Sequence, residues 1–102
     1  MRTQAKPMNG DDAMQVGALE DVQSWLTAAR EGRVEALYNL GLLYSTGQGV
    51  KVDLIEAHKW FNLAAMRGNE DARACRASLA QEMRPEEIAE AQRQARQWLQ
   101  TH

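Results

Sequence analysis

Residues 36–72 read ALYNLGLLYSTGQGVKVDLIEAHKWFNLAAMRGNEDA, and this stretch decides the fold. Its apolar side chains recur at spacings of three and four residues, which is the period of a helix with one buried face. Between the two apolar runs, Gly47 and Gly49 permit backbone angles that other residues resist. Asp53 can cap the next helix, and Glu56 follows at a spacing close to that of a capping box. The stretch therefore predicts two helices that face each other across a short turn.

Part of this pattern occurs twice, 36 residues apart. The shared core is Ala-Ala-x-x-Gly followed by another alanine. Small alanines let two helices approach closely, and a glycine just past a helix adopts the left-handed conformation at little cost, so each copy predicts the end of a helix. The matched pairs are Glu20 and Glu56, Trp25 and Phe61, Ala28 and Ala64, Ala29 and Ala65, Gly32 and Gly68, Glu35 and Asp71, and Ala36 and Ala72.

The whole chain follows the same helical period. We expect an all-α fold, an α/α superhelix or solenoid of about two and a half antiparallel helix-turn-helix repeats. Short connections between the helices predict antiparallel neighbours. Residues 1–13 are expected to form a disordered arm, and residues 14–102 the repeat domain. The five expected helices cover residues 14–31, 33–45, 53–67, 69–83 and 85–100.

Composition excludes several classes of function. The chain has 102 residues, of which 44% are hydrophobic and 25% charged, so it is too rich in core-forming residues to be a disordered protein. A net charge of −2 gives no general attraction to nucleic acid or to anionic membranes. The single cysteine, Cys75, cannot form an internal disulfide, and no secretory signal or membrane-spanning run is evident. A cytoplasmic protein is the expectation.

Residues 36–72 resemble a Sel-one-like repeat, a relative of the tetratricopeptide repeat. The Gly-x-Gly-Val loop and the 36-residue period favour this family over the tetratricopeptide repeat itself. The end of the chain, LAQEMRPEEIAEAQRQARQWL, is similar to the tail that closes many such arrays, which implies a capping helix over residues 85–100. The residues that match the family's signature are Ala36, Leu40, Gly41, Tyr44, Gly47, Gly49, Val50, Asp53, Ala57, Trp60, Phe61, Ala64, Ala65, Gly68 and Ala72.

The chain departs from the family pattern at a few positions. Glu56 stands where a lysine is usual, and Arg84 stands where a serine or threonine usually caps the last helix. Asp21 and Ser24 replace an expected alanine and an aromatic residue in the first helix. The one-sided apolar stripe expected on the last helix is nevertheless complete, and it consists of Ile88, Ala91, Ala95, Trp98 and Leu99.

The resemblance implies an adaptor or scaffold that binds an unidentified protein partner, as a peptide or a helix, and has no chemistry of its own. We expect the binding surface on the free side of the 33–45 helix, at Tyr38, Asn39 and Leu42, and at the equivalent positions of the 69–83 helix. Those equivalents are Ala74, Cys75 and Ser78. The competing interpretation is that these side chains only pack against neighbouring helices. Trp25, Trp60 and Trp98 are read first as core residues, with Trp98 the strongest candidate for a partner contact.

Two further hypotheses belong to other classes. A structural homodimer would pair two chains through the apolar edge left by a half-repeat at the N-terminus. A small hydrolase would need His58 and Cys75 within hydrogen-bond reach in a cleft, and no third group is evident. We expect no catalysis, no cofactor and no metal, because two scattered histidines and one cysteine do not supply three or four converging ligands.

Overall fold

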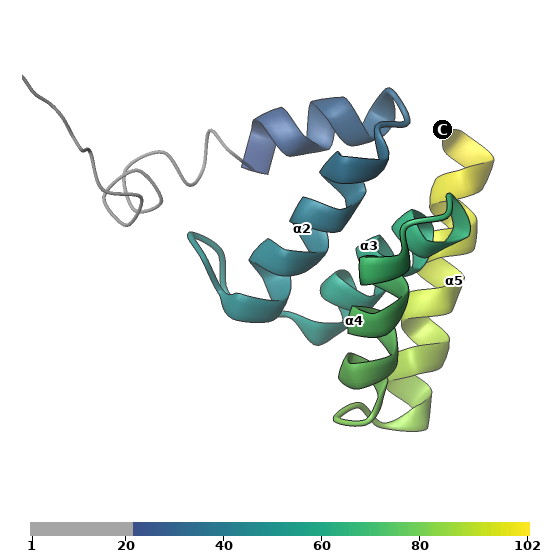
Figure 1. Cartoon of the computed structure of the whole chain (residues 1–102). Coiled ribbons are helices and arrows are strands. Elements are labelled where there is room, and N and C mark those ends of the chain that lie inside the picture. The colour runs from purple at the N-terminus through teal and green to yellow at the C-terminus, as the bar shows by residue number, and fades with distance from the viewer. Residues whose placement is uncertain (1–21) are drawn as a thin grey trace, which may run out of the picture.

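The computed structural model describes residues 22–102, which are helical without any strand. Residues 22–30 are helical, and four further helices follow them (Figure 1). This confirms the all-α repeat fold. The expected disordered arm, and residues 14–21 of the first expected helix, lie outside the described residues, so the domain boundary stays a prediction. The four helices are α2 (Val34–Thr46), α3 (Leu54–Met66), α4 (Glu70–Ala80) and α5 (Pro85–Thr101).

The two Ala-Ala-x-x-Gly copies end equivalent helices, as the repeat predicts. Gly32 has φ 85° and Gly68 has φ 95°, both in the left-handed region that only glycine adopts without strain. The amide of each glycine donates to the alanine carbonyl three residues earlier, at 2.9 Å in both turns. The amide of the residue after each glycine donates to the carbonyl five residues before it, at 3.1 Å in both turns. Identical bonds therefore reverse the chain in the same way twice.

A single cation ties these two turns together. The Arg67 Nη1 donates a hydrogen bond to the Gly32 carbonyl oxygen at 2.8 Å. Because Gly32 precedes α2 and Arg67 precedes α4, the bond fixes how far apart the starts of these two helices lie.

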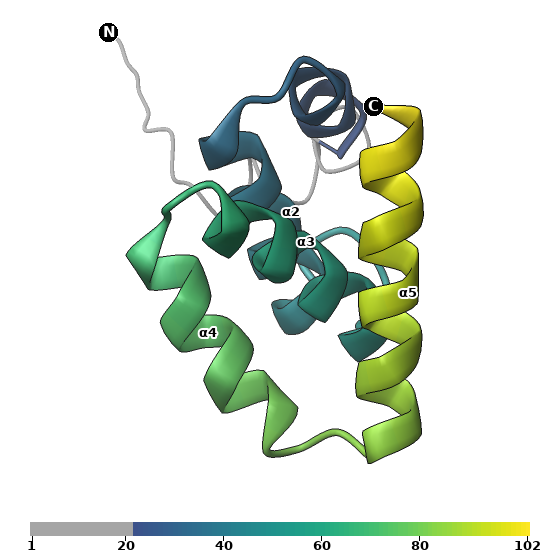
Figure 2. The same ribbon diagram turned by 90° about the vertical axis from the view of Figure 1, so that its right-hand side faces the viewer.

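Helix α3 is the centre of the described part of the chain. It packs against α2, α4 and α5, whereas α4 and α5 diverge from the turn that joins them (Figure 2). The prediction that successive helices pack as neighbours is therefore correct for α2 with α3 and for α3 with α4, but wrong for α4 with α5. Helix α5 returns to α3 instead, where the Trp98 ring meets the Trp60 ring edge-on at a centroid distance of 4.8 Å.

Small residues bring the helices close to α3. Four alanines of the repeat signature are fully buried, Ala36, Ala57, Ala64 and Ala72, and so is Ala91 of the stripe predicted on the last helix. Gly41 of α2 makes the closest approach, because a methyl group added there would overlap ring atoms of Phe61. The absence of a side chain at this position therefore determines how near α2 and α3 lie.

The turn from α2 to α3 confirms the predicted cap and corrects the predicted capping box. The Asp53 carboxylate accepts a hydrogen bond from the Glu56 amide at 3.1 Å. The Glu56 carboxylate does not return to the Asp53 amide, because that amide already donates to the Tyr44 carbonyl at 3.0 Å. Glu56 accepts instead from Trp60 Nε1 at 3.0 Å and pairs with Lys59.

Helix α4 ends at Ala80, three residues before the predicted end. Residues 81–83 form a turn instead, and Arg84, whose helical angles the Pro85 ring disfavours, is extended with ψ 152°. The Arg84 side chain cannot accept a hydrogen bond from the first amides of α5. The Glu87 carboxylate, in the first turn of α5, caps the helix instead by accepting a hydrogen bond from the Arg84 amide at 2.8 Å. The predicted stripe on α5 faces the core except at Leu99, which is 43% exposed.

His58 is the buried polar side chain of the described core. It is 2% exposed, and its Nδ1 has no hydrogen-bond partner among residues 22–102. Burial lowers the pKa of this imidazole below its ordinary value, and the nearby Arg76 guanidinium lowers it further. Arg76 itself is held by a 2.7 Å hydrogen bond to the Asn62 side chain. The folded protein therefore keeps His58 neutral.

Replacing Gly41 with alanine should destabilise the fold, because the added methyl group must displace the Phe61 ring or the whole of α2. We expect a loss of about 1–3 kcal/mol in the free energy of unfolding, typical of an overpacked core. Urea denaturation followed by circular dichroism measures it. Glu35→Ala, an exposed change on the same helix, is the control and should leave the midpoint nearly unchanged; equal midpoints for the two variants would contradict the close contact.

Replacing Asp53 with alanine removes the acceptor for the first free amide of α3. The expected loss is about 1 kcal/mol in the free energy of unfolding, and Asp53→Ser, which keeps an oxygen at the cap, should recover most of it. Thermal and urea unfolding of the three proteins give the comparison. If serine and alanine proved equally destabilising, the capping bond would not be the cause.

Stability should fall as the pH drops below the ordinary histidine pKa of 6.5. The sign follows from proton uptake: the unfolded imidazole binds a proton in this range, whereas the buried His58 resists it because its folded pKa is lowered. The stability that comes from keeping His58 neutral is therefore fully present above pH 6.5 and is lost progressively in more acid solution. His58→Leu should flatten this part of the curve of unfolding free energy against pH, and His102→Gln, at an exposed position, should leave it unchanged. An unaltered slope in the leucine variant would refute the assignment.

Candidate interaction groove

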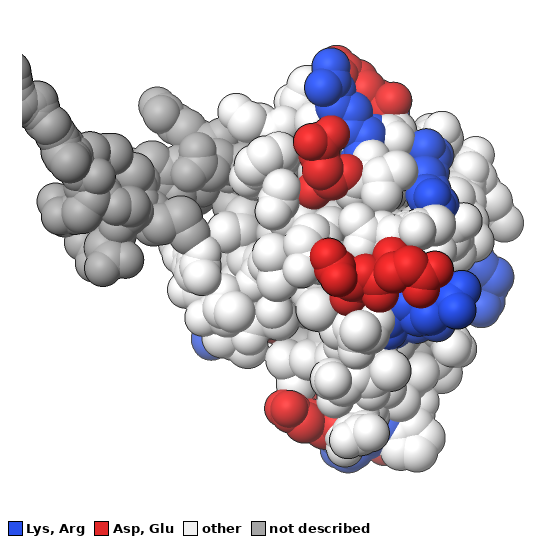
Figure 3. All heavy atoms as spheres, in the orientation of Figure 1, with Lys and Arg blue, Asp and Glu red and all other residues white. Residues whose placement is uncertain are grey.

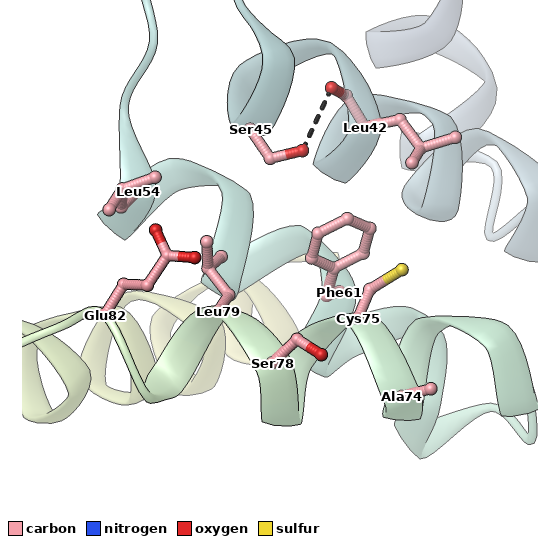
Figure 4. Close-up of a pocket in the computed structure, with 9 residues that line it drawn as sticks. All are labelled: Leu42, Ser45, Leu54, Phe61, Ala74, Cys75, Ser78, Leu79 and Glu82. Atoms are coloured by element: carbon pink, nitrogen blue, oxygen red, sulfur yellow. Dashed lines mark hydrogen bonds between the residues drawn. The ribbon is translucent and has the colours of Figure 1, made fainter.

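A hollow of about 360 Å³ lies between α2 and α4, with α3 beneath it. We call it the α2–α4 groove. Figure 4 shows the Phe61 ring rising from α3 between the two walls, with the Cys75 side chain beside it. The surface of the groove is mostly apolar. Its lining residues are Leu42 and Ser45 of α2, Leu54 and Phe61 of α3, Ala74, Cys75, Ser78 and Leu79 of α4, and Glu82 of the turn that follows.

The groove exists because α2 and α4 are equivalent helices of successive repeats. Each follows a glycine turn of the same geometry, so each presents the same face on the same side of the molecule. Leu42 and its repeat equivalent Ser78 therefore both line the hollow, although they lie 36 residues apart in the sequence. Ala74 and Ser78 are exposed and Cys75 is half-buried, so the α4 wall is open to solvent.

Tyr38 borders the groove without lining it. Its ring lies 5.9 Å from the Phe61 ring, tilted by 48°. Partial burial raises the pKa of the Tyr38 hydroxyl, and the neighbouring Cys75 thiol and Asp71 carboxylate raise it further. The phenol is therefore neutral at physiological pH and can donate a hydrogen bond at the mouth of the groove.

The structure thus divides the predicted binding residues. Leu42 and Cys75 line the groove together with Ala74 and Ser78, whereas Asn39 and Trp98 do not. Trp98 is half-buried between the Trp60 ring and His102, whose imidazole stacks on it at 3.6 Å. This placement agrees with the reading of Trp98 as a packing residue, and its role toward a partner stays a prediction.

Sequence reasoning missed part of the lining. Phe61 was assigned to the core alone, although its ring also forms the floor of the groove. Glu82 was overlooked because the α4 face was followed only as far as Ser78. The signal was present, since Glu82 follows Ser78 by four residues and Cys75 by seven, which places all three on one helix face.

The structure does not bring together the pair that a hydrolase would need. Cys75 lines the groove, whereas His58 is buried in the core, is absent from the groove lining and makes no hydrogen bond to the thiol. Within residues 22–102, no three of the His, Cys, Asp and Glu side chains lie close enough together to hold a metal ion. None of the helices in this part of the chain has the length and apolar character that crossing a membrane requires.

Comparison with known proteins agrees with this geometry. Residues 34–69 match the family model described as the Sel1 repeat, which begins at the start of α2 and ends just before α4. The chain is also 40% identical over 81 residues to the alginate biosynthesis protein AlgK of Azotobacter vinelandii. The match covers 74% of this chain and 18% of that relative. Sel1 repeats generally mediate protein–protein interactions and are typically not catalytic. Residues 34–69 of the chain are therefore a Sel1 repeat.

Proposed function

We propose that this chain is a non-catalytic protein–protein interaction module that holds an apolar segment of a partner in the α2–α4 groove. The observation that carries the proposal is a mostly apolar hollow whose two walls come from equivalent helices of successive repeats, with Phe61 of α3 beneath it. A partner side chain seated there would contact Leu42 on one wall and Cys75 on the other. The side chains of the groove that do not pack fully against neighbouring helices are thus available to contact a partner.

The chemistry of the groove supports binding rather than catalysis. Its polar groups are hydroxyls, one thiol and one carboxylate, and Cys75 has no histidine beside it to act as a base. The similarity to an alginate biosynthesis protein gives one setting in which such repeats work. Because the match covers 18% of that protein, we take from it the repeat architecture alone.

The homodimer remains a separate hypothesis. It assigns the contact to the edge of the first helix, part of which lies outside the described residues. The groove proposal does not depend on it, since α2, α3 and α4 of one chain supply the whole lining.

Filling the groove provides the test. Ser78→Trp places a large ring in the hollow at an exposed position of α4, and Gln92→Trp places the same ring at an exposed position of α5 as a matched control. Partners are captured from a lysate of the source organism, identified by mass spectrometry, purified, and measured by calorimetry against the three proteins. We expect Ser78→Trp to weaken binding by about tenfold or more, equivalent to at least 1.4 kcal/mol, and Gln92→Trp to leave it unchanged.

Circular dichroism confirms that both variants remain folded. A purified partner that binds the Ser78→Trp and Gln92→Trp variants equally well would place the interaction elsewhere and contradict the proposal.

A further inference from the structure

A carboxylate lies near each end of the groove wall that α4 forms. Asp71 precedes Cys75 by one turn of α4, so it shares that residue's face, and Glu82 lies in the turn just past the end of α4 at Ala80. Glu82 lines the groove itself. Asp71 lies close enough to Tyr38, at the other end, to raise the pKa of its hydroxyl.

Glu35, the repeat equivalent of Asp71, does not belong to this groove. It lines a separate hollow between the first helix and α2, together with Trp25 and Ala28. The α2–α4 groove therefore carries Asp71 at one end and Glu82 at the other.

Asp71 and Glu82 are not neutralised within the described chain. Both are exposed, and neither forms an ion pair with a basic side chain of residues 22–102. No lysine or arginine lines the groove. On the face drawn in Figure 3, acidic side chains gather over the start of α4 and near its end, and the surface between them is uncharged except for basic side chains to its right.

We propose that the partner segment carries an apolar anchor flanked on both sides by lysine or arginine. The inference rests on the proposed function and specifies the chemistry of the occupant of that groove. The anchor would sit on Phe61, and the flanking cations would reach the carboxylates at the two ends. Long basic side chains suit this geometry, because their methylene stems lie along an apolar wall while the charged head extends to the rim.

The spacing of the carboxylates sets the spacing of the cations. At a rise of about 1.5 Å per residue, Asp71 and the last residue of α4, Ala80, are about 14 Å apart, and Glu82 follows two residues later, so the two carboxylates lie roughly 16 Å apart. Cations about eleven positions apart on a helical partner match that distance. An extended partner bridges it with about five.

The charges at the rim of the groove affect the selectivity and the rate of association more than they affect the strength of the apolar anchoring contact. Exposed carboxylates attract a cationic segment over a distance of about 10 Å at moderate salt, and they repel an acidic segment that carries the same anchor. The preference for a cationic segment over an acidic one must therefore weaken as salt is added, whereas the contribution of the apolar anchor to the affinity must remain.

Labelled synthetic peptides test the inference, with binding followed by fluorescence anisotropy. One set is helical, with apolar residues at one-face spacing between two end positions eleven residues apart; the other is short and extended, with end positions five apart. Each set is made with lysine, glutamine or glutamate at both ends. We expect the lysine form of at least one set to bind roughly five- to tenfold more tightly than its glutamine form at low salt, and the glutamate form to bind most weakly.

Charge reversal of the protein supplies the second arm. The double variant Asp71→Lys with Glu82→Lys should reverse the order, so that the glutamate peptide binds best. Glu86→Lys, in the exposed first turn of α5, is the control for a reversed charge near the start of a helix and should leave the order unchanged. Unfolding curves of the variants verify that the fold is retained.

The outcomes separate this inference from the proposed function. If all three peptides of a set bind equally, and Ser78→Trp abolishes their binding, the groove is the site but the basic flanks are wrong. If no peptide binds, or if binding is unaffected by Ser78→Trp, the groove itself is overturned as the site.

Discussion

The contact between Gly41 and the Phe61 ring is the constraint on which the rest of the structure depends. It sets the distance between α2 and α3, and because α3 also carries α4 and α5, it positions the other helices indirectly. The same ring then extends past the contact to become the floor of the groove. Phe61 thus belongs to the core, where it is 2% exposed, and it also lies beneath the groove between α2 and α4.

The repeat turns this local contact into a surface. Two turns with the same hydrogen bonds direct α2 and α4 along similar paths, and their outer faces consequently form two walls rather than two unrelated helix surfaces. Carboxylates near the two ends of the groove then make its rim negatively charged, whereas most of its lining is apolar. In this way, a short stretch of small residues and glycines determines where the hollow lies, and the carboxylates near its ends determine its charge.

Much of this architecture could be predicted from particular residues. The paired Ala-Ala-x-x-Gly segments located two helix ends correctly because left-handed glycine and close-packed alanine leave few alternatives, and Asp53 was correctly identified as a cap. Predictions failed where a contact distant in sequence decides the outcome. The divergence of α4 and α5 depends on Trp98 meeting Trp60, and the side chain of Glu56 left the capping box for the Trp60 indole. Helix spacing identified part of the groove, but the place of the buried Phe61 beneath it depends on the arrangement of three helices in space.

The hydrogen bond from Arg67 to the Gly32 carbonyl has a geometric consequence. It joins the beginnings of two helices that are related by one step of the repeat, across the outside of the molecule. The buried packing on α3 sets the rotation and rise of that step, and the guanidinium group acts as an external brace on it. Because Glu31 occupies the equivalent position one step earlier, this brace is particular to one joint and is not a repeating part of the array.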